Sequence, residues 1–131
     1  MKNAGLSAYI DVRKVNILNP KEGIKEALNE LIRKKHADAV IFLTNMLATN
    51  GLYCLNEMNV KIPEDIAAIG FNGNDAFNLF YSPITYIKQP IEQIAKESID
   101  ILIKRIKKTN YKSKLFLEPE LVIQKSSQKY R

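Results

Sequence analysis

Residues 61–75 read KIPEDIAAIGFNGND, and this stretch says more about the architecture of the chain than any other. It predicts a turn, a buried strand at residues 66–71, and a loop crowded with polar side chains at the carboxyl end of that strand. In an open α/β sheet ligands bind at that end, because the loops form a crevice and neighbouring helix N-termini offer free N–H donors. The stretch therefore predicts a site for a small molecule.

Composition limits the classes of protein to which the chain can belong. With 131 residues, 46% apolar and 26% charged, it is predicted to be a soluble globular protein of one domain. No apolar run approaches the roughly 20 residues that span a bilayer, and the first residues do not resemble the start of a signal peptide. The cytoplasm is therefore the expected compartment. The single cysteine, Cys54, and the single histidine, His36, leave no disulfide and no zinc cluster. Neither a metal nor a cofactor is predicted.

The net charge of +6 suggests nucleic acid as a partner, but the placement of the charge argues against it. Basic residues are spread over predicted helix faces and gather near residues 104–114 and in the tail from residue 125 onward. Such tracts are typical of solvated faces and helix ends. No helix-turn-helix pattern, zinc-finger spacing or aromatic RNA-binding signature accompanies them. The chain itself is not expected to read DNA.

Strand-like and helix-like segments alternate along the chain, which favours an α/β fold with a mostly parallel sheet and helices on both faces. The apolar run at 39–43 is typical of a strand covered on both faces. Gly51, inside a predicted helix, is tolerated where that helix closely approaches a sheet or a ligand. Strands are predicted at residues 11–18, 39–43, 66–71, 84–87, 115–117 and 121–123, helices at about 20–34, 46–58 and 91–106, and a helical turn at 76–80.

Polar side chains follow three of the predicted strands at the point where each strand ends. Because the carboxyl ends of parallel strands meet at one edge of a sheet, their amides are expected to converge on one ligand. Amides both donate and accept hydrogen bonds, which suits the hydroxyls of a sugar or a nucleoside. The candidate ligand-binding residues are Asn45, Asn72 and Gln89, and the loop residues Gly73, Asn74 and Asp75 are further candidates.

Each candidate also has a purely structural interpretation. Asparagine and glycine tolerate positive φ, so residues 72–74 can be nothing more than a tight turn. Thr44-Asn45 can serve as the N-cap of the helix that follows, and Gln89 can be a structural hydrogen bonder. The three positions together, at matching strand ends, favour the ligand-binding interpretation.

Residues 61–66, Gly70-Phe71, residues 82–85 and Gln89-Pro90 together resemble the C-terminal part of lac-repressor/Gal-repressor-type (LacI/GalR) transcription regulators. The sensor domain of that family looks like a periplasmic sugar-binding protein. The resemblance implies one effector-binding, periplasmic-binding-protein-like subdomain over residues 1–131, without the family's DNA-binding head and N-terminal subdomain, as a fragment or a truncated gene product. It also implies that a small effector closes two subdomains in a homodimer and so changes the spacing of DNA-binding heads. Asn45, Asn72 and Gln89 match the positions that line the family's effector pocket.

Two departures from the family concern the ligand. Met46 stands where the family usually has aspartate, and Asn72-Gly73 stands where it usually has two aspartates. A carboxylate accepts two sugar hydroxyls through charge-assisted bonds, whereas an amide offers one acceptor and two donors. The loop therefore indicates a small polar ligand more firmly than it indicates a standard pyranose.

The helix at 91–106 has the strongest apolar periodicity in the sequence, and Ile101 widens its apolar surface beyond one stripe. In the family this helix crosses to the N-terminal subdomain. Without that partner, its apolar surface is expected to drive dimerisation, domain swapping or re-docking.

Two other classes of protein remain open at this stage. An extracytoplasmic sugar-binding protein of a transport system shares the predicted fold, although no signal peptide is seen. A small α/β enzyme lacks support, because the sequence has no dinucleotide glycine motif, no phosphate loop and no nucleophile with a plausible base.

Overall fold

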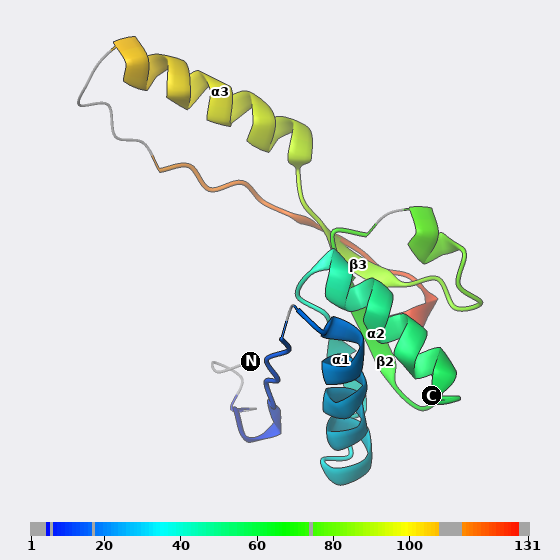
Figure 1. Cartoon of the computed structure of the whole chain (residues 1–131). Helices are drawn as coiled ribbons and strands as arrows, with labels where there is room; N and C mark the ends of the chain where they lie inside the picture. Colours follow the sequence, from blue (N-terminus) through cyan, green and yellow to red (C-terminus); the bar gives the residue numbers. More distant parts are fainter. Residues whose placement is uncertain (1–4, 6, 17, 74, 108–113, 129–131) are drawn as a thin grey trace.

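The computed structural model describes residues 5, 7–16, 18–73, 75–107 and 114–128. Its centre is a four-stranded sheet in the order β1-β2-β3-β4, in which the first three strands are parallel and β4 runs antiparallel to β3 (Figure 1). The mostly parallel sheet expected from the sequence is therefore confirmed. The strands are β1 (Ala39–Ile41), β2 (Ala67–Phe71), β3 (Thr85–Lys88) and β4 (Glu120–Val122).

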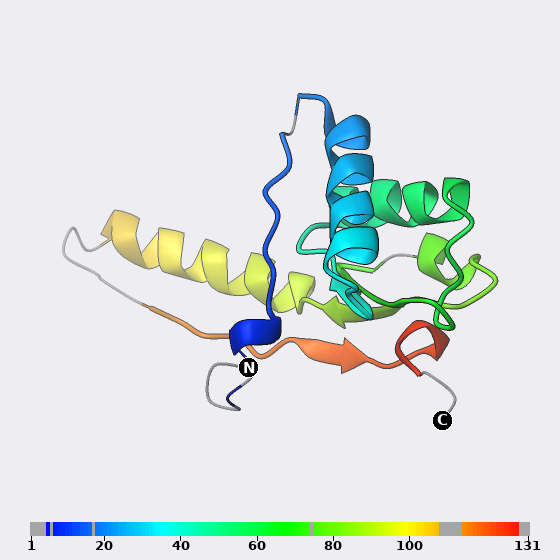
Figure 2. The same ribbon diagram turned by 90° about the horizontal axis from the view of Figure 1, so that it is seen from below.

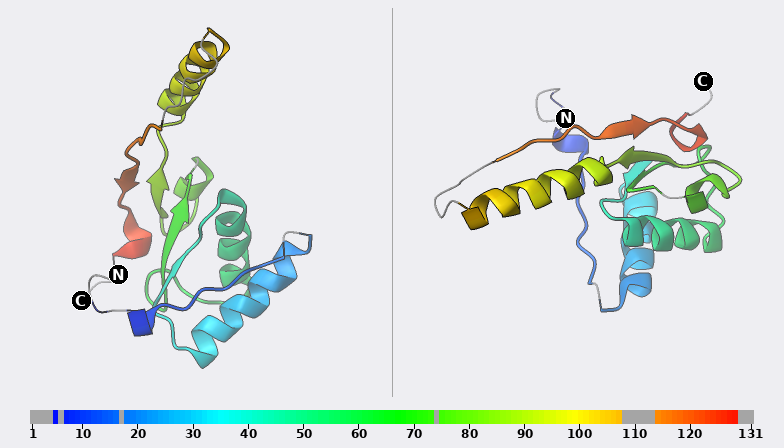
Figure 3. Two further views of the ribbon diagram at one scale, coloured as in Figure 1. Left: turned by 90° about the vertical axis from the view of Figure 1, so that its left-hand side faces the viewer. Right: turned by 90° about the horizontal axis from the view of Figure 1, so that it is seen from above.

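Three α-helices accompany the sheet in the described part of the chain. The first two pack against each other on one side of the sheet, whereas the third extends away from it beyond the carboxyl end of β3 (Figures 2 and 3). The helices are α1 (Pro20–Asn29), continued by the π-helical segment η3 (Glu30–Lys34), α2 (Asn45–Glu57) and α3 (Ile91–Lys107); short 3-10 turns are η2 (Ser7–Tyr9), η4 (Asp75–Asn78) and η5 (Lys125–Ser127).

The core lies between the first two helices and the sheet. Pro20 starts α1, and Ile24 and Leu28, spaced four residues apart, are buried on one face of that helix as predicted. On α2 the buried side chains recur at helical spacing, and the sheet and loops supply the rest. Further members of the core are Phe42, Ala48, Leu52, Cys54, Leu55, Ile62, Ile66, Ala68, Phe77 and Ile84.

Two predicted strands are wrong. Residues 10–16 run along α1 without joining the sheet, tied there by an ion pair of 3.0 Å between Arg13 and Glu30 and by contact of Val15 with α1. Residues 115–117 are extended but pair with no strand. In both segments apolar alternation is present, but a strand also needs a partner backbone, and a local pattern does not specify one.

The cover of the sheet also differs from the two-sided cover expected from the sequence. In β1 the side chain of Val40 is half-buried and that of Ile41 is 50% exposed. Phe42, the residue after the strand, is buried again. Because α1 and α2 share one side and α3 extends outward, the opposite face of the sheet has no α-helix on it in the part of the chain that is described (Figure 3). That difference follows from where α3 is directed, which periodicity does not encode.

Gly51 allows α2 to lie close to the sheet, as the sequence predicts. A Cβ added at this position would overlap the ring of Phe42, which is itself buried. We expect Gly51→Ala to lower the free energy of unfolding by about 1–2 kcal/mol, because overpacking of about 1–3 kcal/mol outweighs a gain in helix propensity of up to about 1 kcal/mol. Urea unfolding followed by circular dichroism measures this difference.

Gly23→Ala is the matched control, because Gly23 also lies inside a helix. Its added Cβ would come within 3.0 Å of Val15, a half-buried side chain on the extended segment beside α1, which can shift outward. The control is expected to change the free energy of unfolding by less than about 1 kcal/mol. Equal losses for both variants would contradict the close approach of α2 to Phe42.

Candidate functional site

The carboxyl end of β1 leads directly into α2. Thr44 caps this helix, and the side-chain amide of Asn45 reaches the end of the neighbouring strand β2. Thr44 is the N-cap: its hydroxyl oxygen accepts a hydrogen bond from the Leu47 backbone N–H at 3.1 Å. Asn45 is the first residue of α2, and its Nδ2 donates to the backbone carbonyl of Asn72 at 2.8 Å. The predicted cap is thus Thr44 alone, while Asn45 connects the ends of β1 and β2.

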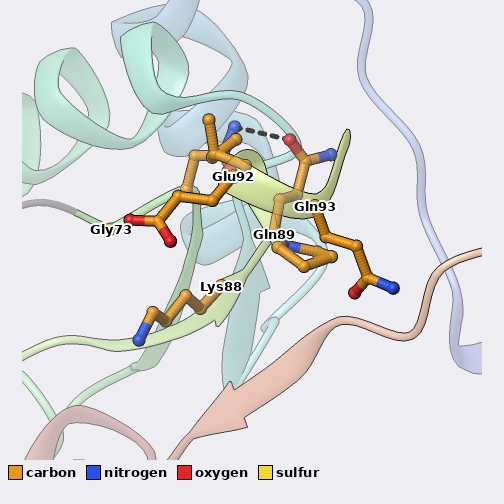
Figure 4. Close-up of a pocket in the computed structure, with 8 residues that line it drawn as sticks. Gly73, Lys88, Gln89, Glu92 and Gln93 are labelled. Atoms are coloured by element: carbon orange, nitrogen blue, oxygen red, sulfur yellow. Dashed lines mark hydrogen bonds between the residues drawn. The ribbon is translucent and has the colours of Figure 1, made fainter. Parts of the chain in front are cut away.

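Asn72 combines the two interpretations that the sequence left open. Its backbone has φ of +54°, in the left-handed region that asparagine tolerates, and its N–H donates to the carbonyl of Ile87 at 2.9 Å. Its side-chain Nδ2 donates to Oε1 of Gln89 at 2.9 Å, the bond drawn as a dashed line in Figure 4. The residue therefore makes the tight turn and also joins the ends of β2 and β3.

The three residues predicted from the sequence form one hydrogen-bonded chain, in which the Asn45 side chain bonds the backbone of Asn72 and the Asn72 side chain bonds that of Gln89. The bond between the last two uses a donor of Asn72 and the acceptor of Gln89. It leaves Oδ1 of Asn72 as an acceptor and Nε2 of Gln89 as a donor for other partners. An acceptor and a donor side by side match a hydroxyl group or a second amide.

An open hollow of about 680 Å³ lies in front of this chain of amides. It is walled on one side by the loop after β2 and on the other by the end of β3 and the first turn of α3 (Figure 4). Asn45 is not part of the lining; it holds the Asn72 backbone from the other side. The lining residues are Asn72, Gly73, Lys88, Gln89, Pro90, Ile91, Glu92 and Gln93.

Three polar members of this lining were not predicted: Lys88, Glu92 and Gln93. The Nζ of Lys88 lies 3.6 Å from a carboxylate oxygen of Glu120 on β4, and both side chains are exposed. The Lys88 ammonium and the Glu92 carboxylate both line the hollow that the amides face (Figure 4). The sequence feature that could have indicated these three residues is their position beside Gln89-Pro90: Lys88 follows a predicted strand, and Glu92 and Gln93 begin a predicted helix.

The remaining loop candidates have different outcomes. Gly73 lines the hollow, and a Cβ added there would overlap the ring of Tyr86, so its lack of a side chain lets the loop lie on β3. Asn74 and the side chain of Asp75 lie outside the described part of the chain. Asp75 begins η4, one residue before the predicted helical turn.

The single thiol of the chain lies in the hydrophobic core, away from the hollow. Burial raises the pKa of the Cys54 thiol, which keeps it protonated inside the core. No group of three or more histidine, cysteine, aspartate or glutamate side chains with metal-binding geometry occurs among the described residues. Within those residues, no helix combines the length and apolarity that crossing a membrane requires.

This fold, with polar strand ends around an open hollow, is typical of α/β domains that bind small molecules. The chain belongs to the family of periplasmic binding protein-like domains, whose family model matches residues 1–127. The predicted resemblance to the C-terminal sensor subdomain of LacI/GalR-type regulators is thereby confirmed.

Among curated proteins, the chain is similar to the HTH-type transcriptional repressor PurR of Photobacterium profundum. The two are 36% identical over 107 residues, which are 80% of this chain and 32% of that protein. A PurR repressor of Histophilus somni is 30% identical over 128 residues, which are 96% of this chain and 38% of that protein. The chain thus spans about a third of the length of the curated relatives it matches.

Solved structures show the same fold. A LacI family transcriptional regulator from Bifidobacterium animalis subsp. lactis superposes with a TM-score of 0.70 at 20% identity, over 82% of this chain and 40% of that one. The transcriptional regulator CelR in its cellobiose complex superposes with a TM-score of 0.73 at 23% identity, over 95% of this chain and 40% of that one.

Proposed function

We propose that this chain is the effector-sensing and dimerisation part of a LacI-family transcriptional regulator. In this proposal residues 1–131 form a single effector-binding subdomain, which contacts DNA only through a head domain outside the chain. It acts in the cytoplasm, as a homodimer, with no cofactor, no membrane and no catalytic activity. Relatives named as transcriptional repressors support this proposal, as does the burial of the single thiol away from the hollow.

The observation that carries the proposal is the chain of amides from Asn45 to Gln89 at the edge of the hollow. Hydrogen bonds among the three hold Asn72 and Gln89 in place, and such preorganised polar groups bind a ligand without the cost of ordering them. The hollow is open, as half of a pocket would be. A small polar effector, sugar-like or nucleoside-like, is the ligand that this arrangement suits.

The proposed mechanism is a shift between open and closed arrangements of two subdomains. A ligand held by Asn72 and Gln89 on this subdomain, and by other groups on the facing one, binds the closed state better than the open state. The difference in affinity moves the equilibrium toward closure, and a dimer converts closure into a new spacing of its DNA-binding heads. Cellobiose in the related CelR complex is one example of an effector of the proposed class.

Removing the Asn72 amide tests the ligand-binding assignment. Glycine keeps the positive φ of this position without strain, so Asn72→Gly removes the side chain while leaving the turn intact. Losing one or two hydrogen bonds is expected to weaken binding by about tenfold or more. A panel of monosaccharides, disaccharides and nucleosides is first screened by thermal shift, and isothermal titration then measures affinity for the compound that binds.

Asn59→Gly is the matched control for this experiment. Asn59 also has positive φ, of +55°, but it is exposed after α2 and does not line the hollow. Affinity is expected to stay unchanged in this variant. If Asn72→Gly bound the same compound as tightly as Asn59→Gly, Asn72 would not be a ligand-binding residue.

A further inference from the structure

The two residues that follow β2 stand in the reverse of the order that the backbone alone would favour. Asn72 has a φ of +54°, in the left-handed region where glycine is the residue without a steric cost. Glycine comes one position later, at Gly73, whose φ lies outside that region. The backbone therefore requires neither residue at its position, and contacts of the loop must explain both.

The contacts of the loop with β3 account for both residues. At position 72 the side-chain Nδ2 donates to Oε1 of Gln89 at 2.9 Å, a bond that glycine could not make. At position 73 an added Cβ would overlap Cγ and both Cδ atoms of Tyr86. These atoms lie at the end of the ring that is attached to β3, so a rotation of the side chain does not clear them. Gly73 is therefore needed so that the loop can lie against the Tyr86 ring.

Tyr86 is held in turn by a second pair of a ring and a glycine. Its ring meets that of Phe77 edge to face, with the ring centroids 6.0 Å apart at an angle of 79°. The Phe77 ring covers Gly70, the register partner of Tyr86 on β2, and a Cβ added at Gly70 would overlap it. Phe77 is 1% exposed, which leaves it little room to move. We call Gly70, Gly73, Phe77 and Tyr86 the loop anchor.

We propose that Tyr86 is a positioning residue of the effector site and that it acts through Asn72. Its ring supports the loop at the place where the Asn72 backbone N–H bonds the Ile87 carbonyl and the Asn72 side chain bonds Gln89. Tyr86 does not itself line the hollow. The ring also leaves no room for a side chain at position 73, so residues 72 and 73 bring one amide and no charge to the hollow. The ligand role of this amide rests on the proposed function, whereas its placement by Tyr86 does not.

Hydrogen exchange followed by NMR tests this placement without any ligand. The amide of Asn72, bonded to Ile87, reports on the loop, and the amide of Phe42, bonded to Ile69, is the internal reference. In Tyr86→Ala the Asn72 amide is expected to exchange at least about tenfold faster, because the loop loses its support. The Phe42 amide is expected to stay within about twofold of its rate in the unmodified chain. Equal acceleration of both amides, or of neither, would overturn the proposal.

Two further variants identify which part of the side chain acts. Tyr86→Phe keeps the ring, and the Asn72 amide is expected to exchange within about twofold of its rate in the unmodified chain. Tyr53→Ala removes the same side chain from the surface of α2, where Tyr53 is 51% exposed, and is expected to leave that rate unchanged. Fast exchange in either variant would show that the ring of Tyr86 is not what holds the loop.

A double-mutant cycle between positions 73 and 86 tests the contact itself, with the melting temperature (Tm) measured by circular dichroism. In the unmodified chain, Gly73→Ala is expected to lower Tm by at least about 2 °C, because the added Cβ overlaps the ring. In Tyr86→Ala the same change is expected to raise Tm by about 1–4 °C, because alanine restricts the unfolded chain and no longer meets a ring. The same sign in both backgrounds would contradict the proposed contact.

Gly73→Ala also tests the proposal in a chain that keeps Tyr86, so the outcome does not depend on whether Tyr86→Ala folds. Its added Cβ pushes the loop off the ring, and the Asn72 amide is expected to exchange at least about tenfold faster than in the unmodified chain. An unchanged rate would overturn the proposal and leave ligand binding by Asn72 standing. Unchanged effector affinity in Asn72→Gly would instead remove the proposed ligand role and leave the placement by Tyr86 intact.

Discussion

Replacing Phe77 with alanine is expected to lower the free energy of unfolding by about 3–5 kcal/mol. Phe77 is 1% exposed, and its ring contacts the backbone at Gly70 and meets Tyr86 edge to face, with the ring centroids 6.0 Å apart at an angle of 79°. The loss combines the transfer free energy of a large ring with the cavity that it leaves. Chemical unfolding in urea, followed by circular dichroism, measures the change.

Leu79→Ala serves as the control for Phe77→Ala. Leu79 lies two residues further along and is 85% exposed, so its removal is expected to change stability by no more than about 0.5 kcal/mol. If the two variants lost similar amounts, the ring of Phe77 would not be packed between β2 and β3 as described. Because Phe77 belongs to η4, which closely follows the loop at Asn72, the same variant is also expected to weaken effector binding.

Ser126→Ala is expected to destabilise the fold by about 2–4 kcal/mol, the second large effect. The hydroxyl of this fully buried serine accepts a hydrogen bond from the Thr85 N–H at 2.8 Å and donates one to the Ala68 carbonyl at 2.6 Å. It thereby continues the ladder between β2 and β3 just before their direct pairing begins. Alanine leaves two buried backbone groups without partners, each at a cost of about 1–3 kcal/mol.

Hydrogen exchange detects this effect at a single site. The amide of Thr85 is expected to exchange faster in Ser126→Ala, because the bond that protects it is the one removed. Ser98→Ala, on the exposed surface of α3, is the matched control and is expected to change neither stability nor exchange at Thr85. Unchanged protection at Thr85 in Ser126→Ala would show that the serine does not hold these strands together.

Local sequence patterns predicted most of the sheet and all three α-helices. Strand β2 follows from five residues flanked by turn signals, and α1 follows from Pro20 and a regular apolar face. These patterns succeed because they record which side of an element is buried, and the buried side is a local property of spacing. The failures are the strands predicted at residues 11–18 and 115–117, because the extended backbone at residues 10–16 and 115–117 pairs with no strand among the described residues. The partner of a strand lies far away in sequence, and alternation does not reveal it.

The candidate site was predictable in part for the same reason. Asn45, Asn72 and Gln89 each follow a strand, and parallel strands bring their ends together, so the cluster of amides follows from topology alone. Lys88, Glu92 and Gln93 were not predictable in this way. They enter the hollow only because α3 starts at a particular angle to β3, and that angle depends on hydrogen bonds at Gln89 and Pro90.

The sequence by itself determined that α3 is a helix and which of its sides is apolar, because periodicity and helix propensity act between residues three and four positions apart. Only the tertiary structure decided where that apolar side lies. The hydrophobic effect has no direction of its own and rewards burial against any apolar surface. The same isoleucines are therefore compatible with several partners, and the hydrogen-bonded junction at Gln89 turns them outward, away from the sheet of their own chain.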